Sequence, residues 1–385
     1  MVIEMEKNTT VSVVNHQVDN YSKLLTTSAL QLNISTFIPA RSPPLEDIEY
    51  DEFVRRSSEF SAMVILCLFG TVGNVHTILV YLRVKDMKER IHVRTLIIWL
   101  SVIDLTTSFV VMPFEMVAFR WRYSISSNAV CKLFRYTAYT TGMSSWLILT
   151  VIGHERYKNI YGILLGTKSV LPCKTCKLIS WLKGKFSFSK HNVACILVII
   201  SSLIVSTPVF VFIGIVDTVP LNYARLLGTQ CTTQNKYRSK LTAGLYAGVV
   251  GLFAISCFMY CSYCYGKILY LIHKQSKKEK ARRENSIYLR AKVHKAQQSF
   301  DYKNRKPHYK VTISLIVATG FSLCGFIIFA IGTAFGVSNS VLRHAIVTGV
   351  MKRGSFINNA CNPIIYFMCD SKFRQACKKL YIKQT

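Results

Sequence analysis

The charged triplet Glu155-Arg156-Tyr157 lies at the end of an apolar run that begins at Ser144. Because burial of either charge alone would cost several kcal/mol, an adjacent acid and base at this point indicate the edge of an apolar environment. A second carboxylate, Asp104, lies midway through another apolar run, where a charge is costly and marks a functional site by default. No nucleophile–base set, phosphate-binding loop or metal-ligand cluster accompanies these residues, so the sequence does not predict an enzyme or a resident metal.

The composition indicates the environment of these charges. The chain has 385 residues, of which 51% are hydrophobic, and a formal net charge of +29. A nucleic-acid-binding protein spreads its Lys and Arg over a soluble fold, whereas here long apolar segments alternate with basic ones. The sequence therefore predicts a membrane protein with the lipid bilayer as partner, and no nucleic acid.

Seven apolar runs are long enough to cross about 30 Å of hydrocarbon, which takes about 20 residues as a helix. Each should be helical, because backbone N–H and C=O groups in lipid must be satisfied within their own segment. The predicted spans are Phe60–Leu82, Leu96–Phe119, Leu133–Gly153, Val193–Ile215, Leu241–Ile268, Val311–Phe335 and Val341–Met368.

Lys and Arg collect after the first, third and fifth spans, which places those connectors in the cytoplasm. The amino terminus is then extracellular, in a multi-pass protein of the plasma membrane. Residues 1–59 have few large apolar clusters and predict a loosely ordered tail. The tail carries three glycosylation sequons, at Asn8, Asn20 and Asn33.

The seventh span ends in Asn362-Pro363-Ile364-Ile365-Tyr366. A proline inside a membrane helix removes one backbone hydrogen bond and makes a kink, which is a natural hinge. The following segment from Phe373 to Leu380 is short, basic and amphipathic, so it is suited to the inner leaflet, and Cys377 is a candidate for palmitoylation. The predicted fold is an all-α membrane protein: a seven-transmembrane helix bundle at 60–368, with a short amphipathic eighth helix and cytoplasmic tail at 369–385.

These motifs resemble those of the rhodopsin-like (class A) G-protein-coupled receptors over about residues 60–380. The resemblance implies a receptor that binds an extracellular ligand and opens an inner cleft for a heterotrimeric G protein when the sixth helix moves away from the third. Glu155 would hold Arg156 at rest, and Arg156 would reach Tyr265 and Tyr366 in the active state. The coupling switch would comprise Glu155, Arg156, Tyr157, Tyr265, Asn362, Pro363 and Tyr366.

The resemblance also implies a disulfide and an ion site. Cys131 matches the family's cysteine at the start of the third helix, and Cys231 is the single cysteine of the loop between the fourth and fifth spans. Oxygen-bearing side chains match a hydrated pocket that can hold an allosteric sodium ion. The alternative is that Asp104 is a hydrogen-bonded structural carboxyl without an ion. The pocket residues would be Asn74, Asp104, Ser145, Asn358 and Asn362.

The outer segments carry many cations and few acids, which favours a ligand with an anionic group. We expect a peptide, with an anionic lipid or small acid as the alternative. Phe356 stands where a retinal-binding opsin needs lysine, and Ala138 stands where a monoamine receptor needs an acid. The expected ligand mouth includes Arg120, Trp121, Arg122, Arg135, Arg225 and Lys352. The acidic segment from Glu46 to Glu52 is either a solvated linker or a counter-surface for a basic partner.

Departures from the family pattern keep a second function open. Gly325 and Ile327 replace the tryptophan and proline of the sixth helix, and Cys257 replaces the proline of the fifth. A non-signalling or scavenging receptor would tolerate these losses. The preserved Arg156 and Tyr366 argue for signalling. The short carboxyl tail is poor in Ser and Thr, so arrestin binding, if present, would use the third inner loop.

Overall fold

The computed structural model describes residues 43–88, 91–165, 190–218, 227–238, 241–290, 307–338 and 353–382. Pro44–Thr385 forms one compact unit, and the fold below is that of this unit. The three sequons at Asn8, Asn20 and Asn33 lie outside the described residues, and so do Arg225 and Lys352.

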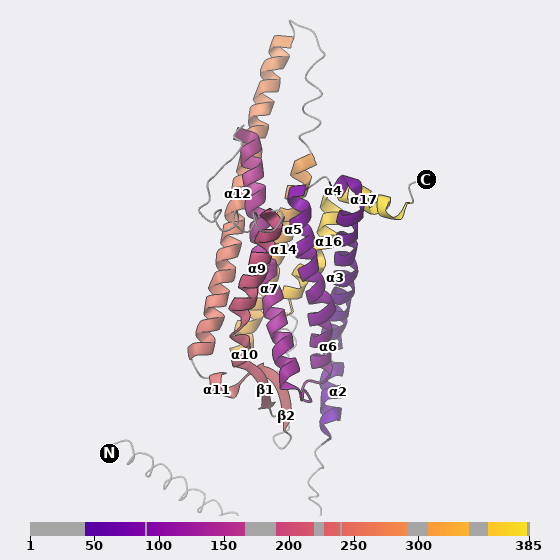
Figure 1. Cartoon of the computed structure of the whole chain (residues 1–385), viewed down its shortest axis with the longest axis vertical. Coiled ribbons are helices and arrows are strands. Elements are labelled where there is room, and N and C mark those ends of the chain that lie inside the picture. Colours follow the sequence, from indigo (N-terminus) through magenta and orange to yellow (C-terminus); the bar gives the residue numbers. More distant parts are fainter. Residues whose placement is uncertain are drawn as a thin grey trace, which may run out of the picture. The chain divides into compact units, whose positions relative to one another are not determined.

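Long helices overlap the described parts of the predicted apolar spans, and they lie side by side along one axis (Figure 1). The first part of the seventh predicted span, residues 341–352, lies outside the described residues. By length and composition, four described helical segments could cross a membrane, and they begin at Ser57, Val93, Lys190 and Gly244. The helices are α3 (Ser57–Arg83), α5 (Ile91–Thr106) continued by η1 (Thr107–Val111) and α6 (Met112–Arg120), α7 (Asn128–Leu165), α9 (Lys190–Ser206) followed by α10 (Val209–Phe212), α12 (Leu241–Arg290), α14 (Pro307–Ser338) and α16 (Ser355–Cys369).

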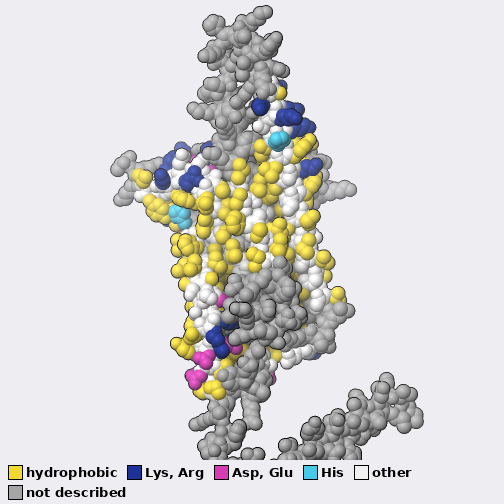
Figure 2. Space-filling view, turned by 180° about the vertical axis from the view of Figure 1, so that it is seen from behind, with side chains coloured by type: hydrophobic (Ala, Val, Ile, Leu, Met, Phe, Trp, Pro, Cys, Tyr) yellow, Lys and Arg dark blue, Asp and Glu magenta, His cyan; other side chains and the backbone are white. Residues whose placement is uncertain are grey.

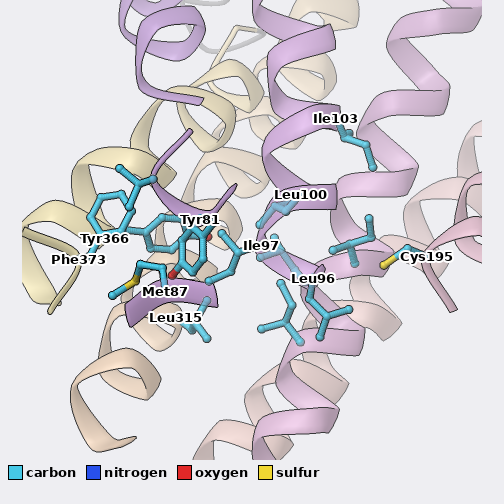
Figure 3. Close-up of a cluster of buried hydrophobic side chains, with 14 of the residues drawn as sticks. Tyr81, Met87, Leu96, Ile97, Leu100, Ile103, Cys195, Leu315, Tyr366 and Phe373 are labelled. Carbon is cyan, nitrogen blue, oxygen red and sulfur yellow. The ribbon is translucent and has the colours of Figure 1, made fainter. Parts of the chain in front are cut away.

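Two helices hold the bundle together. Helix α7 contacts α5, α9, α12 and α14, and α16 contacts α3, α5 and α14. The short α4 (Lys85–Lys88) and the amphipathic α17 (Ser371–Tyr381) lie at the same end, against α3. A buried cluster joins these elements, with Tyr81, Met87, Leu100, Tyr366 and Phe373 among its side chains (Figure 3). The predicted amphipathic segment is therefore a helix whose apolar face packs on the bundle.

The surface agrees with a membrane environment. Apolar side chains cover the middle of the described face in Figure 2, while Lys and Arg gather toward one end. Large apolar side chains such as Phe109, Val249 and Met259 are more than half exposed, and exposure of this kind is stable in lipid rather than in water.

Part of the expected loose tail is helical. Helix α2 (Leu45–Arg55) follows Pro44, and α3 begins at Ser57, before the predicted end of the tail at residue 59. The tail prediction is wrong for this segment because α2 has a partner: Ile48 and Glu49 are buried against the outer end of the bundle, and α2 contacts α6.

The segment after α10 contains a hairpin. Strands β1 (Ile213–Thr218) and β2 (Gly228–Thr233) pair antiparallel, with Ile215 opposite Cys231, and the short α11 (Asn235–Arg238) follows. The fourth span was predicted to remain helical to Ile215, but helical structure ends at Phe212 and the β-branched residues after it form β1. The fifth helix, α12, is longer than predicted and reaches Arg290.

Candidate functional site

The buried carboxylate of Asp104 is the centre of a polar network in the middle of the bundle. Asn362 of α16 donates from Nδ2 to Oδ2 of Asp104 across 2.7 Å, and Ser145 of α7 donates to Oδ1 across 3.3 Å. Asn358 donates to the Ser145 hydroxyl across 3.2 Å. The predicted pocket residues on α5, α7 and α16 are therefore in mutual contact, away from water.

Asn74 of α3 contacts α16 through a backbone carbonyl rather than through Asp104. Its Nδ2 donates to the carbonyl of Gly70 across 2.8 Å and to the carbonyl of Asn359 across 2.9 Å. Asn359 is the residue whose carbonyl has no helical donor, because Pro363 four residues later has no N–H. Gly73 allows the approach, since a Cβ there would lie 2.9 Å from the Pro363 ring. Helix α3 thus satisfies the kink in α16.

The oxygen atoms of this region fit the hard-ligand chemistry of sodium. Oδ1 of Asn74 and Oδ1 of Asn358 are both buried and, within the described part of the chain, accept no hydrogen bond. These two amide oxygens, the Asp104 carboxylate and the Ser145 hydroxyl all belong to the predicted ion pocket, so the pocket residues include oxygen atoms that could bind a cation.

The predicted coupling residues gather at the opposite end from the hairpin. Arg156 is buried with 7% exposure, whereas Glu155 and Tyr157 are half-buried. Tyr265 and Tyr366 are also buried, and the Tyr265 ring lies 3.6 Å from a Cβ placed on Gly153, one turn before Arg156. The pairing of Arg156 with Glu155 at rest stays a prediction.

Two helices meet beside this cluster. The Thr319 hydroxyl of α14 donates to the Tyr265 hydroxyl of α12 across 3.4 Å, which links these two helices. The buried hydroxyl of Tyr366 has no hydrogen-bond partner among the described residues, so its oxygen is available to a group that moves toward it.

The end of the bundle that carries the hairpin also carries the predicted disulfide. Cys131 at the start of α7 is bonded to Cys231 of β2, with their Cα atoms 5.7 Å apart. The bridge fixes the hairpin over α7, and β1 also contacts α7. This pairing is confirmed.

The cationic mouth is less open than the sequence suggests. Arg122 lies 3.8 Å from the Glu52 carboxylate of α2, and Arg135 forms an ion pair with Glu115. Both arginines are therefore engaged with acids of the chain itself. Arg120 instead lies over aromatic rings, including that of Trp121, which is 49% exposed.

Part of the acidic segment binds the first outer loop. The Glu49 carboxylate is 1% exposed and accepts from the backbone N–H of Tyr123 across 2.5 Å and from the Ser124 hydroxyl across 3.0 Å. Glu52 accepts from the Tyr123 hydroxyl across 3.0 Å. Burial raises the pKa of Tyr123, which keeps this hydroxyl protonated as a donor. Neither a solvated linker nor a free counter-surface describes Glu49 and Glu52.

A second outer network was not predicted. Glu59 is 1% exposed and pairs with Arg56 across 2.8 Å and with Arg353, just before α16. Both guanidinium groups also lie over the Phe119 ring, at 4.8 and 5.0 Å. Burial lowers the pKa of Arg56 to about 10, with repulsion from Arg122 as the next cause. Arg353 lies far from Arg56 and Glu59 in the sequence, so the sequence gives no local signal of the whole network.

The departures in the sixth helix have a structural counterpart. A Cβ on Gly325 would lie 2.7 Å from the carbonyl oxygen of Gly354, so a tryptophan here would force α14 away from the start of α16. An aromatic cluster forms instead with Trp146 of α7, whose ring is 5.1 Å from Phe326 and 6.1 Å from Phe258. The tryptophan that packs against α12 and α14 is therefore supplied by α7.

Cys377 faces the bundle. Its side chain is 6% exposed within the core cluster, and burial raises the pKa of its thiol to about 11. Because acylation needs an accessible thiolate, modification would require α17 to leave the bundle. Palmitoylation of Cys377 stays a prediction that this burial disfavours.

Comparison with known proteins identifies the class to which this arrangement belongs. The chain is 26% identical over 342 residues to a blue-sensitive opsin of Psalidodon fasciatus, covering 84% of this chain and 81% of the opsin. It is 25% identical over 384 residues to a gonadotropin-releasing hormone II receptor of Clarias gariepinus, covering 96% of this chain and 88% of that receptor. Residues 73–366 match the family of 7 transmembrane receptors (rhodopsin family). That match covers most of the bundle, including Asp104, Arg156 and Tyr366, and the chain is therefore a membrane protein that belongs to the rhodopsin family of seven-transmembrane receptors, and a receptor rather than an enzyme.

Proposed function

We propose that this protein is a plasma-membrane receptor that binds an extracellular peptide carrying an anionic group and activates a heterotrimeric G protein. The amino terminus and the hairpin lie outside the cell, and the basic connectors lie in the cytoplasm. Seven helices cross the bilayer, and α17 lies along its inner surface. Membership of the rhodopsin family supports this topology, and the relative named as a hormone receptor supports a peptide ligand.

One observation carries the signalling part of the proposal. The Asp104 network reaches α16 at Asn362, and the same helix continues through Pro363 to the buried Tyr366 beside the inner core cluster. A rearrangement at the kink is therefore mechanically connected to the end that holds Arg156. A ligand that favours one arrangement by a few kcal/mol would shift the population of the inner end accordingly.

The light-sensing alternative has less support. One relative is named as an opsin, yet Phe356 occupies the position at which the opsin pattern requires lysine for retinal. A second candidate function, ligand binding without signalling, is favoured by one observation: Gly325 lies against Gly354, where the family pattern has tryptophan. The two candidates differ in whether Arg156 contributes to a measurable signal.

The test is basal and peptide-stimulated G-protein activation in cells that express the chain, beside Arg156→Ala at matched surface level. Lys158→Ala, a substitution of another base on the same helix, is the control. We expect a signal that Arg156→Ala alters and Lys158→Ala leaves unchanged. Surface binding of labelled peptide with no signal from any variant would contradict coupling and favour the scavenging receptor.

We further propose that the Asp104 region binds an allosteric sodium ion. Asp104, Ser145 and the free amide oxygens of Asn74 and Asn358 are the residues that would hold it, and the ion would neutralise the buried carboxylate. Asn362 would orient that carboxylate by its hydrogen bond. We expect NaCl to raise the unfolding temperature of the purified receptor relative to equal choline chloride, and Asp104→Asn to abolish that difference. An equal difference in the variant would contradict this site.

A further inference from the structure

We propose that Arg120 is the acid-binding residue of the ligand mouth, and that its guanidinium, held by aromatic rings of α2 and the first outer loop, binds a carboxylate of the ligand. This inference rests on the proposed function, because it assigns to one side chain the recognition of an acidic peptide.

The Arg120 guanidinium lies in a cage of three rings. Its central carbon is 5.5 Å from the ring centroids of Tyr50 and Phe53 and 5.6 Å from that of Trp121. Attraction between a cation and the face of an aromatic ring holds the guanidinium in place. A ring face is not one of the oxygen acceptors that an arginine N–H group normally bonds, so these contacts leave the donors able to bond a carboxylate. The cage therefore positions a cation without occupying its hydrogen-bond donors.

Four other arginines near this end of the bundle form ion pairs with acids of the chain, whereas Arg120 does not in the described part of the chain. Those pairs are Arg56 and Arg353 with Glu59, Arg122 with Glu52, and Arg135 with Glu115. In the part of the chain that the structure describes, the guanidinium of Arg120 lies over these three rings, and no carboxylate forms an ion pair with it. Among the described residues, Lys132 also lacks an acidic partner, but no described aromatic ring lies under its ammonium as the three rings lie around Arg120.

The site is reachable from outside the cell. Arg120 is the last residue of α6 and is half-buried, while the rims of its cage, Tyr50 and Trp121, are 55% and 49% exposed. Partial burial strengthens a charge pair relative to one in bulk water. The fork of N–H donors in arginine matches the two oxygens of a carboxylate. A terminal carboxylate or an acidic side chain of a peptide fits this edge.

The cage makes α2 part of the ligand site. Two of its rings, Tyr50 and Phe53, belong to α2, which lies outside the residues that match the receptor family. Glu49 and Glu52 fix α2 to the first outer loop through Tyr123, so the cage is held from both sides. The segment that precedes the first span thus supplies recognition.

The probe for the test is fluorescently labelled octaglutamate, with octaglutamine as the uncharged control. The full chain is purified in nanodiscs of phosphatidylcholine, which has no net charge. We expect octaglutamate to bind more tightly than octaglutamine, and Arg120→Gln to weaken octaglutamate binding by about tenfold or more. Arg122→Gln removes the same charge two residues away, but from an arginine already paired with Glu52, and should weaken binding by less than about twofold.

Two further variants separate a specific site from general attraction to a basic protein. Arg120→Lys keeps the charge and removes the fork, so it should lose part of the affinity. Phe53→Leu keeps an apolar side chain and removes one ring, and should weaken binding roughly threefold. Should Arg120→Gln unfold more readily than the native protein, Arg120→Lys decides, and unchanged affinity in that variant overturns the assignment.

Equal weakening by Arg120→Gln and Arg122→Gln would overturn the inference, and so would equal binding of octaglutamate and octaglutamine to the native protein. Either result leaves the signalling proposal intact, because that proposal depends on the response to Arg156→Ala and not on this probe.

Discussion

Asn74 donates from its side-chain amide to the backbone oxygen of Asn359 across 2.9 Å, and so replaces the hydrogen bond that Pro363 removes from α16. The contact is buried on both sides, because Asn74 is fully buried and Asn359 is 7% exposed. A hinge of this kind costs little at rest, since its freed carbonyl has a partner on a neighbouring helix. The stability of the hinge therefore depends on α3, which carries no other part of the predicted switch.

Asn74→Ala should lower the stability of the receptor by about 1–3 kcal/mol, because it leaves the buried Asn359 carbonyl without a donor. Thr77→Ala, at an equally buried site on α3 whose hydroxyl bonds the carbonyl of Gly73, is the control and should cost less. The measurement is the unfolding temperature in detergent. Pro363→Ala restores a backbone N–H, so the penalty of Asn74→Ala should be smaller in that background. An unchanged penalty would separate Asn74 from the kink.

Gly325→Ala should destabilise the contact between α14 and α16. The new Cβ would lie 2.7 Å from the carbonyl oxygen of Gly354, which is backbone and has little freedom to move away. Gly320→Ala is the matched control on the same helix, because nothing lies within 4 Å of a Cβ there, and alanine favours the helix by about 1 kcal/mol. We expect a lower unfolding temperature for Gly325→Ala and an equal or higher one for Gly320→Ala. The opposite order would exclude close packing at Gly325.

The helices were predictable from the sequence because their signals are local. Apolar runs of sufficient length predicted the central parts of α3, α7 and α12. Pro363 predicted the interruption of backbone hydrogen bonding inside α16. The ends of the helices were less predictable. Helix α12 continues to Arg290 through charged residues that are compatible with a helix in water, and hydropathy alone does not mark where it ends.

Parts of the candidate site were also predictable from local sequence, and other parts were not. Asp104 and Arg156 were identifiable because a charge inside or beside an apolar run is conspicuous. The pairing of Arg122 with Glu52 and of Arg353 with Glu59 was not identifiable, since it joins residues far apart in the sequence. Composition therefore indicated a cationic mouth, whereas the three-dimensional arrangement shows that acids of α2, α3 and α6 already pair with Arg122, Arg353 and Arg135 respectively.

Cys231→Ser should remove most of the receptor from the cell surface. The bridge to Cys131 closes a loop across 100 residues, and loss of such a disulfide typically costs about 2–5 kcal/mol. Cys131→Ser should have the same effect. The double variant should be no worse than either single variant, because the two single variants and the double variant all lack the same disulfide bond. The measurement is surface level by antibody against an amino-terminal tag. A double variant markedly worse than both would show that each cysteine stabilises the fold separately.

Glu59→Gln should be among the most destabilising changes of a single charge at the outer end. Its carboxylate is 1% exposed and pairs with both Arg56 and Arg353, so the substitution leaves two partly buried guanidinium groups without their acid. Removal of one partner from a buried pair costs about 3–5 kcal/mol. Glu115→Gln is the matched control, because within the described part of the chain Glu115 pairs with one cation, Arg135, and the pair is more exposed, at 15% and 29%. The comparison is the unfolding temperature of the purified variants. We expect a clearly larger decrease for Glu59→Gln, and equal decreases would show that water reaches Glu59 as readily as Glu115.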